Sequence, residues 1–393
     1  MTSTFSFGFS GDDIDVDESE VDAVVELQGV GVKAQQGERE SKLPELVQAK
    51  VHDMQEWLNT LPSQISYNKL SIPSQNGTGI TLGRREVFDI RAQLMAEDEE
   101  GSEELISSLE EGDIKPNFYE GGFKTWECAI DLAKLMTSEE ERANVLGLTG
   151  TGGGDNVDEG DVHVVELGAG TAMPSLALLA QLLSHPMSTT PPRRKFHFTF
   201  ADYNAVVLRL VTLPNILLTW KVSARQTAGI SEEPVSNAQN QQDQEDDGEL
   251  DIDPQLLDSF RVDLERRGIT IEFVSGAWSP SFVDLVLQSR NPNSGKGCHR
   301  RLVLASETIY SPSSLNAFAE TLLALLRAPA GAGSSRALVA AKRVYFGVGG
   351  GVDEFLMVLR EVAGEKVDVQ QKVEIKTEGV GRVVLQVRPA AGQ

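Results

Sequence analysis

From residue 162 onward, short apolar runs alternate with longer segments that have the period of a helix. The first pair consists of a β-rich run at 162–167 and a Leu-rich segment at 174–183, which is too long for a strand. The pairing repeats four times, with the expected strand given before the expected helix: 195–202 and 205–220, 270–278 and 281–289, 301–307 and 313–326, and 336–347 and 352–364.

Two further strands are expected in the tail, at 373–377 and 380–389, with a turn between them. Strands that alternate with helices form largely parallel sheets, because parallel neighbours need a crossover connection. The sequence therefore predicts an α/β fold with a doubly wound, mostly parallel seven-stranded sheet. The expected strands are apolar on both alternations, which is typical of burial on two faces, so His163 and His197 within them are interpreted as structural.

The formal net charge of −24 is concentrated in three segments. Residues 1–46 hold 11 acidic and 3 basic residues, and 94–113 and 231–253 each hold 9 acidic residues and no basic one. Such segments bury little apolar surface and are expected to be solvated loops or tails, unless they serve to attract a basic substrate. The expected organisation is a mobile acidic tail at 1–46, an extension with short helical or strand pieces at 47–114, and the α/β domain at 115–390 with a mobile acidic insertion near 229–253.

The same charge makes direct binding to nucleic-acid phosphates unexpected and fits a basic protein partner better. Cys128 and Cys298 are far apart and lack CxxC spacing, so neither a disulfide framework nor a metal site is expected. The first residues lack the basic start and the long apolar run of a signal peptide. No uninterrupted apolar stretch of about 18 residues, the length of a transmembrane helix, occurs. These features predict a soluble intracellular protein without a membrane segment. A monomer is expected, although no feature of the sequence indicates the oligomeric state.

A glycine loop, Glu-Leu-Gly-Ala-Gly at 166–170, ends the first expected strand. Gly168 and Gly170 permit a tight turn and a close approach of a ligand to the backbone, and Pro174 suits the first turn of the next helix. Met173 stands where a dinucleotide-binding fingerprint would have its third glycine. No Gly-Lys-Ser/Thr follows, which excludes a phosphate-binding P-loop.

Polar and aromatic residues stand at or just past the ends of three other expected strands, where open α/β sheets bind ligands. An acidic side chain after the second strand can accept hydrogen bonds from ribose hydroxyls, and an aromatic ring after the third can lie near an adenine. The competing interpretations are a helix cap for Asp202, a cover over the core for Trp278 and a surface turn for Glu307. The candidates are Asp202, Tyr203 and Asn204, then Gly276 and Trp278, then Ser306, Glu307 and Tyr310.

Four more stretches carry a family resemblance when they are added to the glycine loop. They are GGFKTWEC at 121–128, SGAWS at 275–279, SETIY at 306–310 and AKRVYFGVGG at 341–350. Five motifs in this order resemble the histidine protein methyltransferase family, in patches over 115–388. This family is a branch of the seven-strand S-adenosylmethionine-dependent methyltransferases. It lies beside the lysine methyltransferases with an Asp/Glu-x-x-Tyr motif, which Glu307 and Tyr310 match.

The resemblance implies S-adenosylmethionine as the cofactor, and Glu307 and Tyr310 as catalytic residues. The family often has an acidic residue where this chain has Ala277, so Ala277 is given no side-chain role. The implied cofactor contacts are Trp126 and Glu127 along the methionine part, Gly168 and Gly170 beneath it, Asp202, Tyr203 and Asn204 around the ribose and its neighbours, Gly276 and Trp278 near the adenine, and Ser306 from the fourth strand.

The implied activity is protein-histidine N-methyl transfer to one histidine of a large-subunit ribosomal protein, ribosomal protein three, in the cytoplasm and nucleus. A neutral imidazole already has a free lone pair on one nitrogen, so no strong base is required. Glu307, Tyr310 or a backbone carbonyl is expected to hold the N–H of one ring nitrogen and so present the other. The alternatives are a lysine methyltransferase acting on a chaperone or translation factor, and a catalytically silent ribosome-assembly scaffold.

Overall fold

The computed structural model describes residues 47–73, 79–97, 121–146, 160–185, 194–227, 248–288, 300–327, 335–376 and 379–390. The expected acidic tail at 1–46 lies outside these ranges, as do most of the acidic segments at 94–113 and 231–253.

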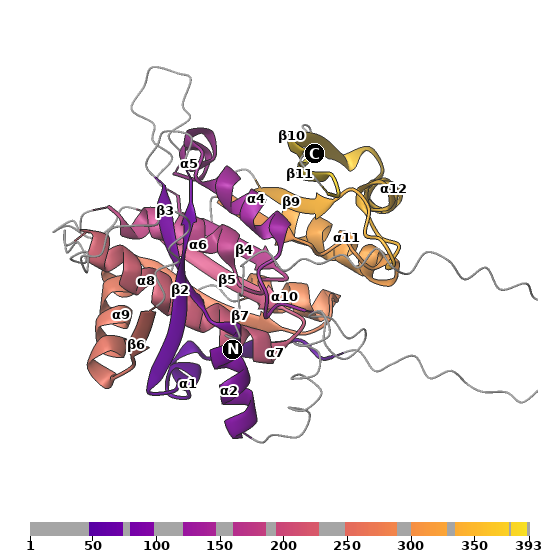
Figure 1. Ribbon diagram of the computed structural model, residues 1–393. Helices are drawn as coiled ribbons and strands as arrows, with labels where there is room; N and C mark the ends of the chain where they lie inside the picture. The colour runs from indigo at the N-terminus through magenta and orange to yellow at the C-terminus, as the bar shows by residue number, and fades with distance from the viewer. Residues whose placement is uncertain are drawn as a thin grey trace, which may run out of the picture. The chain divides into compact units, whose positions relative to one another are not determined.

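Within the described residues, the main sheet has eight strands in the order β1-β7-β5-β4-β8-β9-β11-β10 (Figure 1). The five strands from β7 to β9 are parallel, and β11, β10 and β1 are antiparallel to their neighbours. The predicted seven strands and doubly wound order are confirmed, and β1 is an eighth strand that was not predicted. The strands are β1 Lys50–His52, β4 Val162–Leu167, β5 Phe196–Asp202, β7 Ile269–Ser275, β8 Arg300–Ser306, β9 Ser335–Lys342, β10 Val367–Ile375 and β11 Arg382–Pro389.

Helices cover both faces of this sheet (Figure 1). The residues of α4, α5, α6, α8 and α9 pack in one hydrophobic cluster, and those of α10, α11 and α12 pack in a second. The first group comprises α4 Glu127–Met136, α5 Glu139–Leu146, α6 Met173–Leu183, α8 Leu213–Thr227 and α9 Pro254–Arg266, and α8 is preceded by α7 Ala205–Val207 and the π-helical turn η1 Leu208–Thr212. The second comprises α10 Pro280–Gln288, α11 Pro312–Arg327 and α12 Val352–Ala363, followed by the 3-10 turn η2 Gly364–Lys366.

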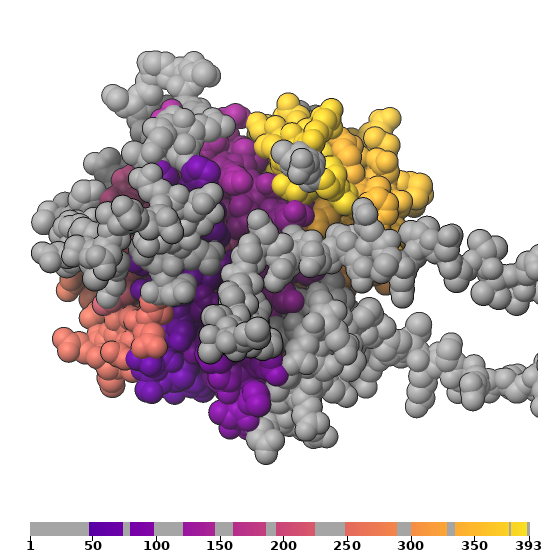
Figure 2. Space-filling model, viewed as in Figure 1, coloured from indigo at the N-terminus to yellow at the C-terminus, as the bar shows by residue number. Residues whose placement is uncertain are grey.

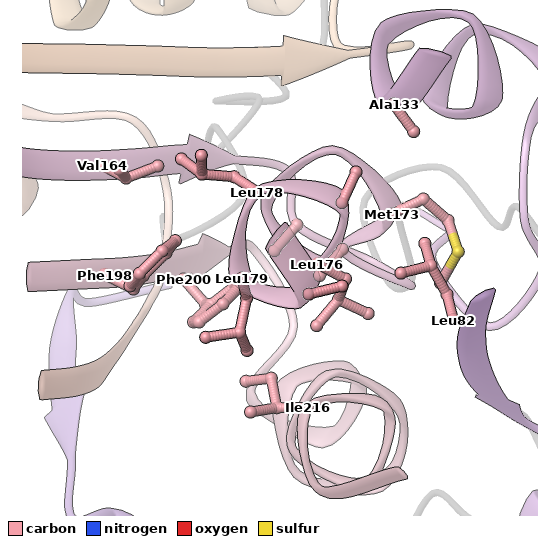
Figure 3. Packing of buried hydrophobic residues seen from close by; sticks show 14 of the residues in the cluster. Leu82, Ala133, Val164, Met173, Leu176, Leu178, Leu179, Phe198, Phe200 and Ile216 are labelled. Atoms are coloured by element: carbon pink, nitrogen blue, oxygen red, sulfur yellow. The ribbon is translucent and has the colours of Figure 1, made fainter. Parts of the chain in front are cut away.

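Neighbouring residues of one strand belong to different clusters, because successive side chains of a strand point to opposite faces. Val164 packs in the first cluster and Val165 in the second, and Leu302 and Val303 divide in the same way. The apolar residues of both alternations are therefore buried, as the sequence predicts for central strands. Figure 3 shows the first cluster, with the side chains of α6 lying between the central strands and α8.

The segment predicted as one helix at 205–220 is divided into α7, η1 and α8. The stretch Ala205–Ala224 is long and apolar enough to cross a membrane, and 78% of its apolar window is buried inside the protein. Such burial is typical of the core helix of a globular domain. The strand expected at 336–347 ends at Lys342, and a loop at 343–351 leads into α12.

Two acidic segments expected to be solvated loops are ordered at one end. Glu97 ends α2, Val87–Glu97, where its carboxylate accepts two hydrogen bonds of 2.7 and 2.8 Å from the Arg209 guanidinium. Residues 248–253 form β6, Gly248–Asp251, and the cap of α9, in which Asp253 accepts the Leu256 N–H at 2.7 Å. The segment 231–253 is therefore not a loop throughout, and α9 was not predicted at all.

The N-terminal extension contributes a second, three-stranded sheet in the order β3-β2-β6, with β2 at Gln64–Ile72 and β3 at Ile80–Arg85. The pairing of β2 with β6 brings two segments together that are far apart in the chain, and Figure 2 shows their indigo and salmon surfaces in contact. Gly83 of β3 lies against α8, where an added Cβ would fall 2.6 Å from the Leu218 Cβ. The small sheet therefore covers the outer side of α8.

The extension also holds β1 and the short helix α1, Met54–Leu58, against β7. Trp57 stacks on His52, with ring centroids 4.4 Å apart, and lies 5.2 Å from the Phe273 ring. Leu58 is fully buried in the first cluster. This part of the extension therefore packs on the α/β domain.

Candidate functional site

A pocket of about 600 Å³ opens past the carboxyl ends of the parallel strands. This is the edge at which open α/β sheets bind ligands. Nine predicted site residues line it: Trp126, Gly168, Gly170, Asp202, Tyr203, Trp278, Ser306, Glu307 and Tyr310. Three other predicted residues, Glu127, Asn204 and Gly276, do not line it but contact segments that do.

The glycine loop between β4 and α6 forms the floor of the pocket. Gly168 has φ +65°, and an added Cβ would fall 2.7 Å from the Thr308 methyl group, so only glycine fits there. The carbonyl of Gly170 accepts a 2.7 Å hydrogen bond from the Thr212 hydroxyl, and Asn215 donates to the carbonyl of Thr171 at 3.1 Å. Side chains of η1 and α8 therefore hold the backbone of the glycine loop in place.

Two buried carboxylates also hold this loop. Asp202, at the end of β5, accepts the Gly170 N–H and the Asn204 N–H, both at 3.0 Å. Glu166, at the base of the loop, accepts the Ser175 N–H in the first turn of α6 at 3.0 Å. Complete burial raises the pKa of Glu166 to about 8, and the nearby Asp202 carboxylate adds to the rise.

Asp202 and its two neighbours serve different purposes. Asp202 lines the pocket, where its carboxylate is a hydrogen-bond acceptor of the kind that binds ribose hydroxyls. Tyr203 lines the pocket beside it. Asn204 turns away and donates to the Gly121 carbonyl at 3.3 Å, so it fixes the segment that carries Gly121 and Gly122 into the pocket wall.

Trp278 lines the pocket and also covers part of the core. Its ring meets Phe282 and Phe318 edge to face, with centroids 5.1 and 6.0 Å away. The two interpretations of this residue are therefore compatible. Gly276 lies behind it, donates its N–H to the Asp202 carbonyl at 3.0 Å, and would clash with Ala49 if it carried a Cβ.

Trp126 precedes the first turn of α4 and presents its ring to the pocket. The Lys342 ammonium lies 5.6 Å from the centre of this ring, within the range of a cation–π contact. Glu127 points away and forms ion pairs of 3.3 Å with Lys342 and with Arg382. Glu127 therefore acts on the pocket through Lys342, and its implied contact with the cofactor stays a prediction.

Glu307 lies directly after β8 with φ +56°, a left-handed conformation that costs a residue other than glycine about 1–3 kcal/mol. Its carboxylate accepts the Cys128 N–H in the first turn of α4 at 3.4 Å, and no side chain of the helix's own cap does so. A carboxylate is favourable at a helix N-terminus because of the helix dipole. Glu307 therefore links the end of β8 to the helix that begins beside Trp126.

Glu307 also faces Tyr345 and the Cys128 thiol. Burial, followed by the Glu307 charge, raises the pKa of both groups well above their ordinary values, so both stay protonated. The Tyr345 hydroxyl accepts the Lys342 N–H at 3.2 Å, and its ring meets the Tyr310 ring edge to face with centroids 6.3 Å apart. The two members of the predicted Glu-x-x-Tyr motif are thus connected through Tyr345.

Several lining residues were not predicted as site residues, namely Lys342, Val344, Tyr345, Phe346, Val348 and Val380. The first five fall in the stretch 341–350, which carried the family resemblance but no residue roles. The glycines and aromatic residues of this stretch were the sequence feature that indicated a loop at the binding site. Val380 had no such indication, because it lies in the turn region between two terminal strands.

The pocket suits a ligand that combines a nucleoside with a flexible arm. The backbone of the glycine loop borders the pocket with no side chain at Gly168 or Gly170, Asp202 supplies hydrogen-bond acceptors, and Trp278 supplies an aromatic face. Trp126, the residue before α4, adds a second aromatic side chain to the lining of the pocket. Among the described residues, no group of three or more His, Cys, Asp or Glu side chains could hold a metal ion.

Comparison with known proteins gives a consistent family. The chain is 33% identical over 330 residues to Histidine protein methyltransferase 1 of Schizosaccharomyces pombe, covering 84% of this chain and 81% of that protein. It is 32% identical to the Saccharomyces cerevisiae protein of the same name, covering 90% and 89%. The mouse Histidine protein methyltransferase 1 homolog is 28% identical over 70% of this chain and 58% of its own.

Comparisons with family models and with solved structures add little to the family assignment. No protein-family model matches the chain. Among solved structures, a putative RNA methyltransferase from Pyrococcus horikoshii covers 78% of this chain and 98% of its own at 10% identity and a TM-score of 0.31. TrmN from Thermus thermophilus covers 58% and 44% at 13% identity and a TM-score of 0.28. The family therefore follows from the two yeast relatives: the chain belongs to the histidine protein methyltransferase family, enzymes that use S-adenosylmethionine.

Proposed function

We propose that this enzyme methylates one histidine of a large-subunit ribosomal protein, ribosomal protein three, as a monomer in the cytoplasm and nucleus. The net charge of −24 supports a basic protein as the substrate, because opposite charges speed association and favour the complex. The observation that supports histidine transfer most directly is the membership of the family together with the intact pocket at the strand ends.

The residues of the pocket divide into two groups. When bound, S-adenosylmethionine supplies a methyl group on a positively charged sulfur. The substrate imidazole can attack this group directly, so the enzyme needs no nucleophilic side chain of its own. Asp202 would accept hydrogen bonds from the ribose, and Trp278 would cover the adenine. The backbone of Gly168 and Gly170 allows the cofactor to approach closely. These groups align the reactants and exclude water.

Glu307 and Tyr310 are proposed to select the reacting nitrogen of the histidine. A neutral imidazole has one N–H and one lone pair, so a group that accepts the N–H presents the lone pair to the methyl group. Both residues line the pocket. One carboxylate oxygen of Glu307 accepts the Cys128 N–H, and the carboxylate also faces the Tyr345 hydroxyl, so the acceptor for the imidazole N–H is a remaining lone pair of this carboxylate or the Tyr310 hydroxyl.

Glu307→Gln and Tyr310→Phe test these roles. Both variants should lower the rate of methyl transfer by about 10-fold or more while the affinity for S-adenosylmethionine stays within about twofold, since general acid–base and orienting groups contribute on this scale. Rates are measured with excess cofactor, and affinity by calorimetry. A variant that loses cofactor affinity instead has a structural role, and for Glu307 that result would point to its link with α4.

The substrate is tested by incubating the purified enzyme with methyl-labelled S-adenosylmethionine and unassembled large-subunit ribosomal proteins. Acid hydrolysis and amino-acid analysis of the labelled band then identify the product. Methylhistidine in one band supports the proposal and identifies the ring nitrogen. Methyllysine would place the activity with the neighbouring lysine methyltransferases, and failure to bind the cofactor would favour a scaffold.

A further inference from the structure

Four apolar side chains surround the outer part of the pocket, and we call them the apolar rim. Val344, Phe346 and Val348 belong to the loop 343–351 between β9 and α12, and Val380 lies in the turn between β10 and β11. Val344 is 47% exposed, Phe346 78% and Val348 49%. Contiguous exposed apolar groups on a protein surface usually mark a binding site.

The loop that carries three of these side chains is anchored at several points. The Tyr345 N–H donates to the Gly350 carbonyl at 3.0 Å, and the Gly349 N–H donates to the Tyr345 carbonyl at 3.1 Å. Val344 also forms a β-bridge with Gly351. Gly350 packs directly on the Tyr310 carbonyl oxygen, which a Cβ would approach to 2.1 Å. The exposed side chains therefore project from a fixed backbone, which lowers the entropy lost on binding.

The chemistry of the rim indicates what it binds. Arg343 is the only charged residue of the loop, and its guanidinium pairs with Glu374 of β10 at 2.6 Å. The rim therefore offers apolar surface and no charge of its own to a ligand. It is continuous with the pocket, since Tyr345 contacts Tyr310 inside while its neighbour Phe346 is exposed outside.

We propose that the apolar rim binds an apolar side chain of the protein substrate, within a few residues of the histidine that is methylated. The inference rests on the proposed function, because a substrate histidine that reaches Glu307 and Tyr310 must have its flanking chain at the mouth of the pocket. Phe346 is the principal contact, since aromatic side chains dominate binding energy at protein interfaces. The rim thus selects the substrate by its flanking sequence as well as by its histidine.

Phe346→Ser is the direct test. It should raise the KM for the labelled ribosomal protein about 10-fold or more, as expected when a large apolar side chain loses its contact, and leave kcat and cofactor affinity within about twofold. Phe346→Leu should recover part of the loss. Phe88→Ser is the matched control, because Phe88 is 74% exposed on α2 and does not line the pocket, so its KM should equal that of the wild type.

A second measurement identifies the partner group. In a peptide of the labelled site, the apolar residues that flank the histidine are changed to serine one at a time. One such change should raise the KM of the wild type and have no further effect with Phe346→Ser, because contacting groups are not additive. Additive effects would overturn the proposal.

The remaining outcomes distinguish a failure of the proposed function from a failure of the inference alone. If the wild type labels no ribosomal protein, the proposed function fails and the inference fails with it. If the wild type labels a protein and Phe346→Ser has the KM of the wild type, only the inference fails. A lowered KM would mean that a segment of the same chain covers the rim. A wild-type dimer in sedimentation that Phe346→Ser dissociates would mean that a second copy does.

Discussion

Glu166 and Asp202 lie under the same glycine loop but have different surroundings. Asp202 accepts two backbone N–H groups and borders the pocket, whereas Glu166 accepts one and is completely buried. Burial disfavours a charged carboxylate, and hydrogen bonds favour it. At Glu166 burial prevails, so this side chain is largely neutral at pH 7 and holds the start of α6 as an uncharged acceptor.

Glu166 makes the free energy of unfolding depend on pH. Its pKa rises from 4.5 to about 8 on folding, so between these values the folded protein holds a proton that the unfolded chain has lost. Stability from this group is complete below pH 4.5 and is lost as the pH rises to 8, by at most about 1.4 kcal/mol per pH unit. Glu166→Gln keeps an acceptor for Ser175 without the titration.

The measurement is urea unfolding of wild type and Glu166→Gln at pH 5.5 and 7.5. The wild type should lose stability relative to the variant at the higher pH. Taking the difference between the two proteins cancels the other titrating groups. Equal pH dependence in both proteins would show that Glu166 is not perturbed.

Gly168→Ala should abolish cofactor binding without unfolding the protein. The left-handed φ of +65° costs an alanine about 1–2 kcal/mol, and its Cβ would also displace Thr308 on the pocket wall. Gly364→Ala is the matched control, since Gly364 has φ +61° and nothing within 4 Å of the added Cβ. Calorimetry should show no cofactor binding for the first variant and normal binding for the second.

At the scale of elements, the pairing of β1 with β7 includes a side-chain contact of His52. The His52 ring stacks on Trp57, and its Nε2 lies 2.7 Å from the Ser275 hydroxyl. Burial, followed by the charge of Lys50, lowers the pKa of His52 from 6.5 to about 4. The unfolded chain therefore binds a proton between these pH values that the folded protein does not.

His52→Gln should reduce the sensitivity of the protein to acid. The contribution of His52 is complete above pH 6.5 and is lost as the pH falls toward 4, because a lowered pKa of a base opposes protonation in the folded state. Thermal unfolding at pH 7 and pH 5 should show a smaller decrease for the variant than for the wild type. Ser275→Ala, which removes the partner but no titrating group, should keep the wild-type decrease.

At the scale of the whole molecule, the acidic residues before β6 can be tested for capture of a basic substrate. A variant with Gln or Asn in place of the six acids of 231–247 keeps the chain length and leaves β6 and the Asp253 cap intact. If these charges attract the substrate, the variant should have a higher KM at low ionic strength and the wild-type KM at high ionic strength, where charges are screened. An equal KM at low salt would show that the segment is only a solvated loop.

Much of the fold follows from the local pattern of apolar and polar residues in the sequence. Short apolar runs and helical periods repeat from 162 onward, and they predict seven strands and five helices near their observed places. The helix α9 had a pattern as well, with Leu256, Phe260 and Leu264 at helical spacing, but it was missed beside the acidic segment. The site residues at strand ends were predictable because parallel strands bring their carboxyl ends to one edge.

The sequence by itself determined the order of strands and helices along the chain, the glycine loop and the edge of the sheet at which ligands bind, because burial leaves short apolar runs and helical periods in neighbouring residues. Only the tertiary structure decided that β1 pairs with β7, that Glu307 meets the start of α4, and that Val380 joins Phe346 on one rim. These features bring together residues that are far apart in the chain, so no local pattern encodes them.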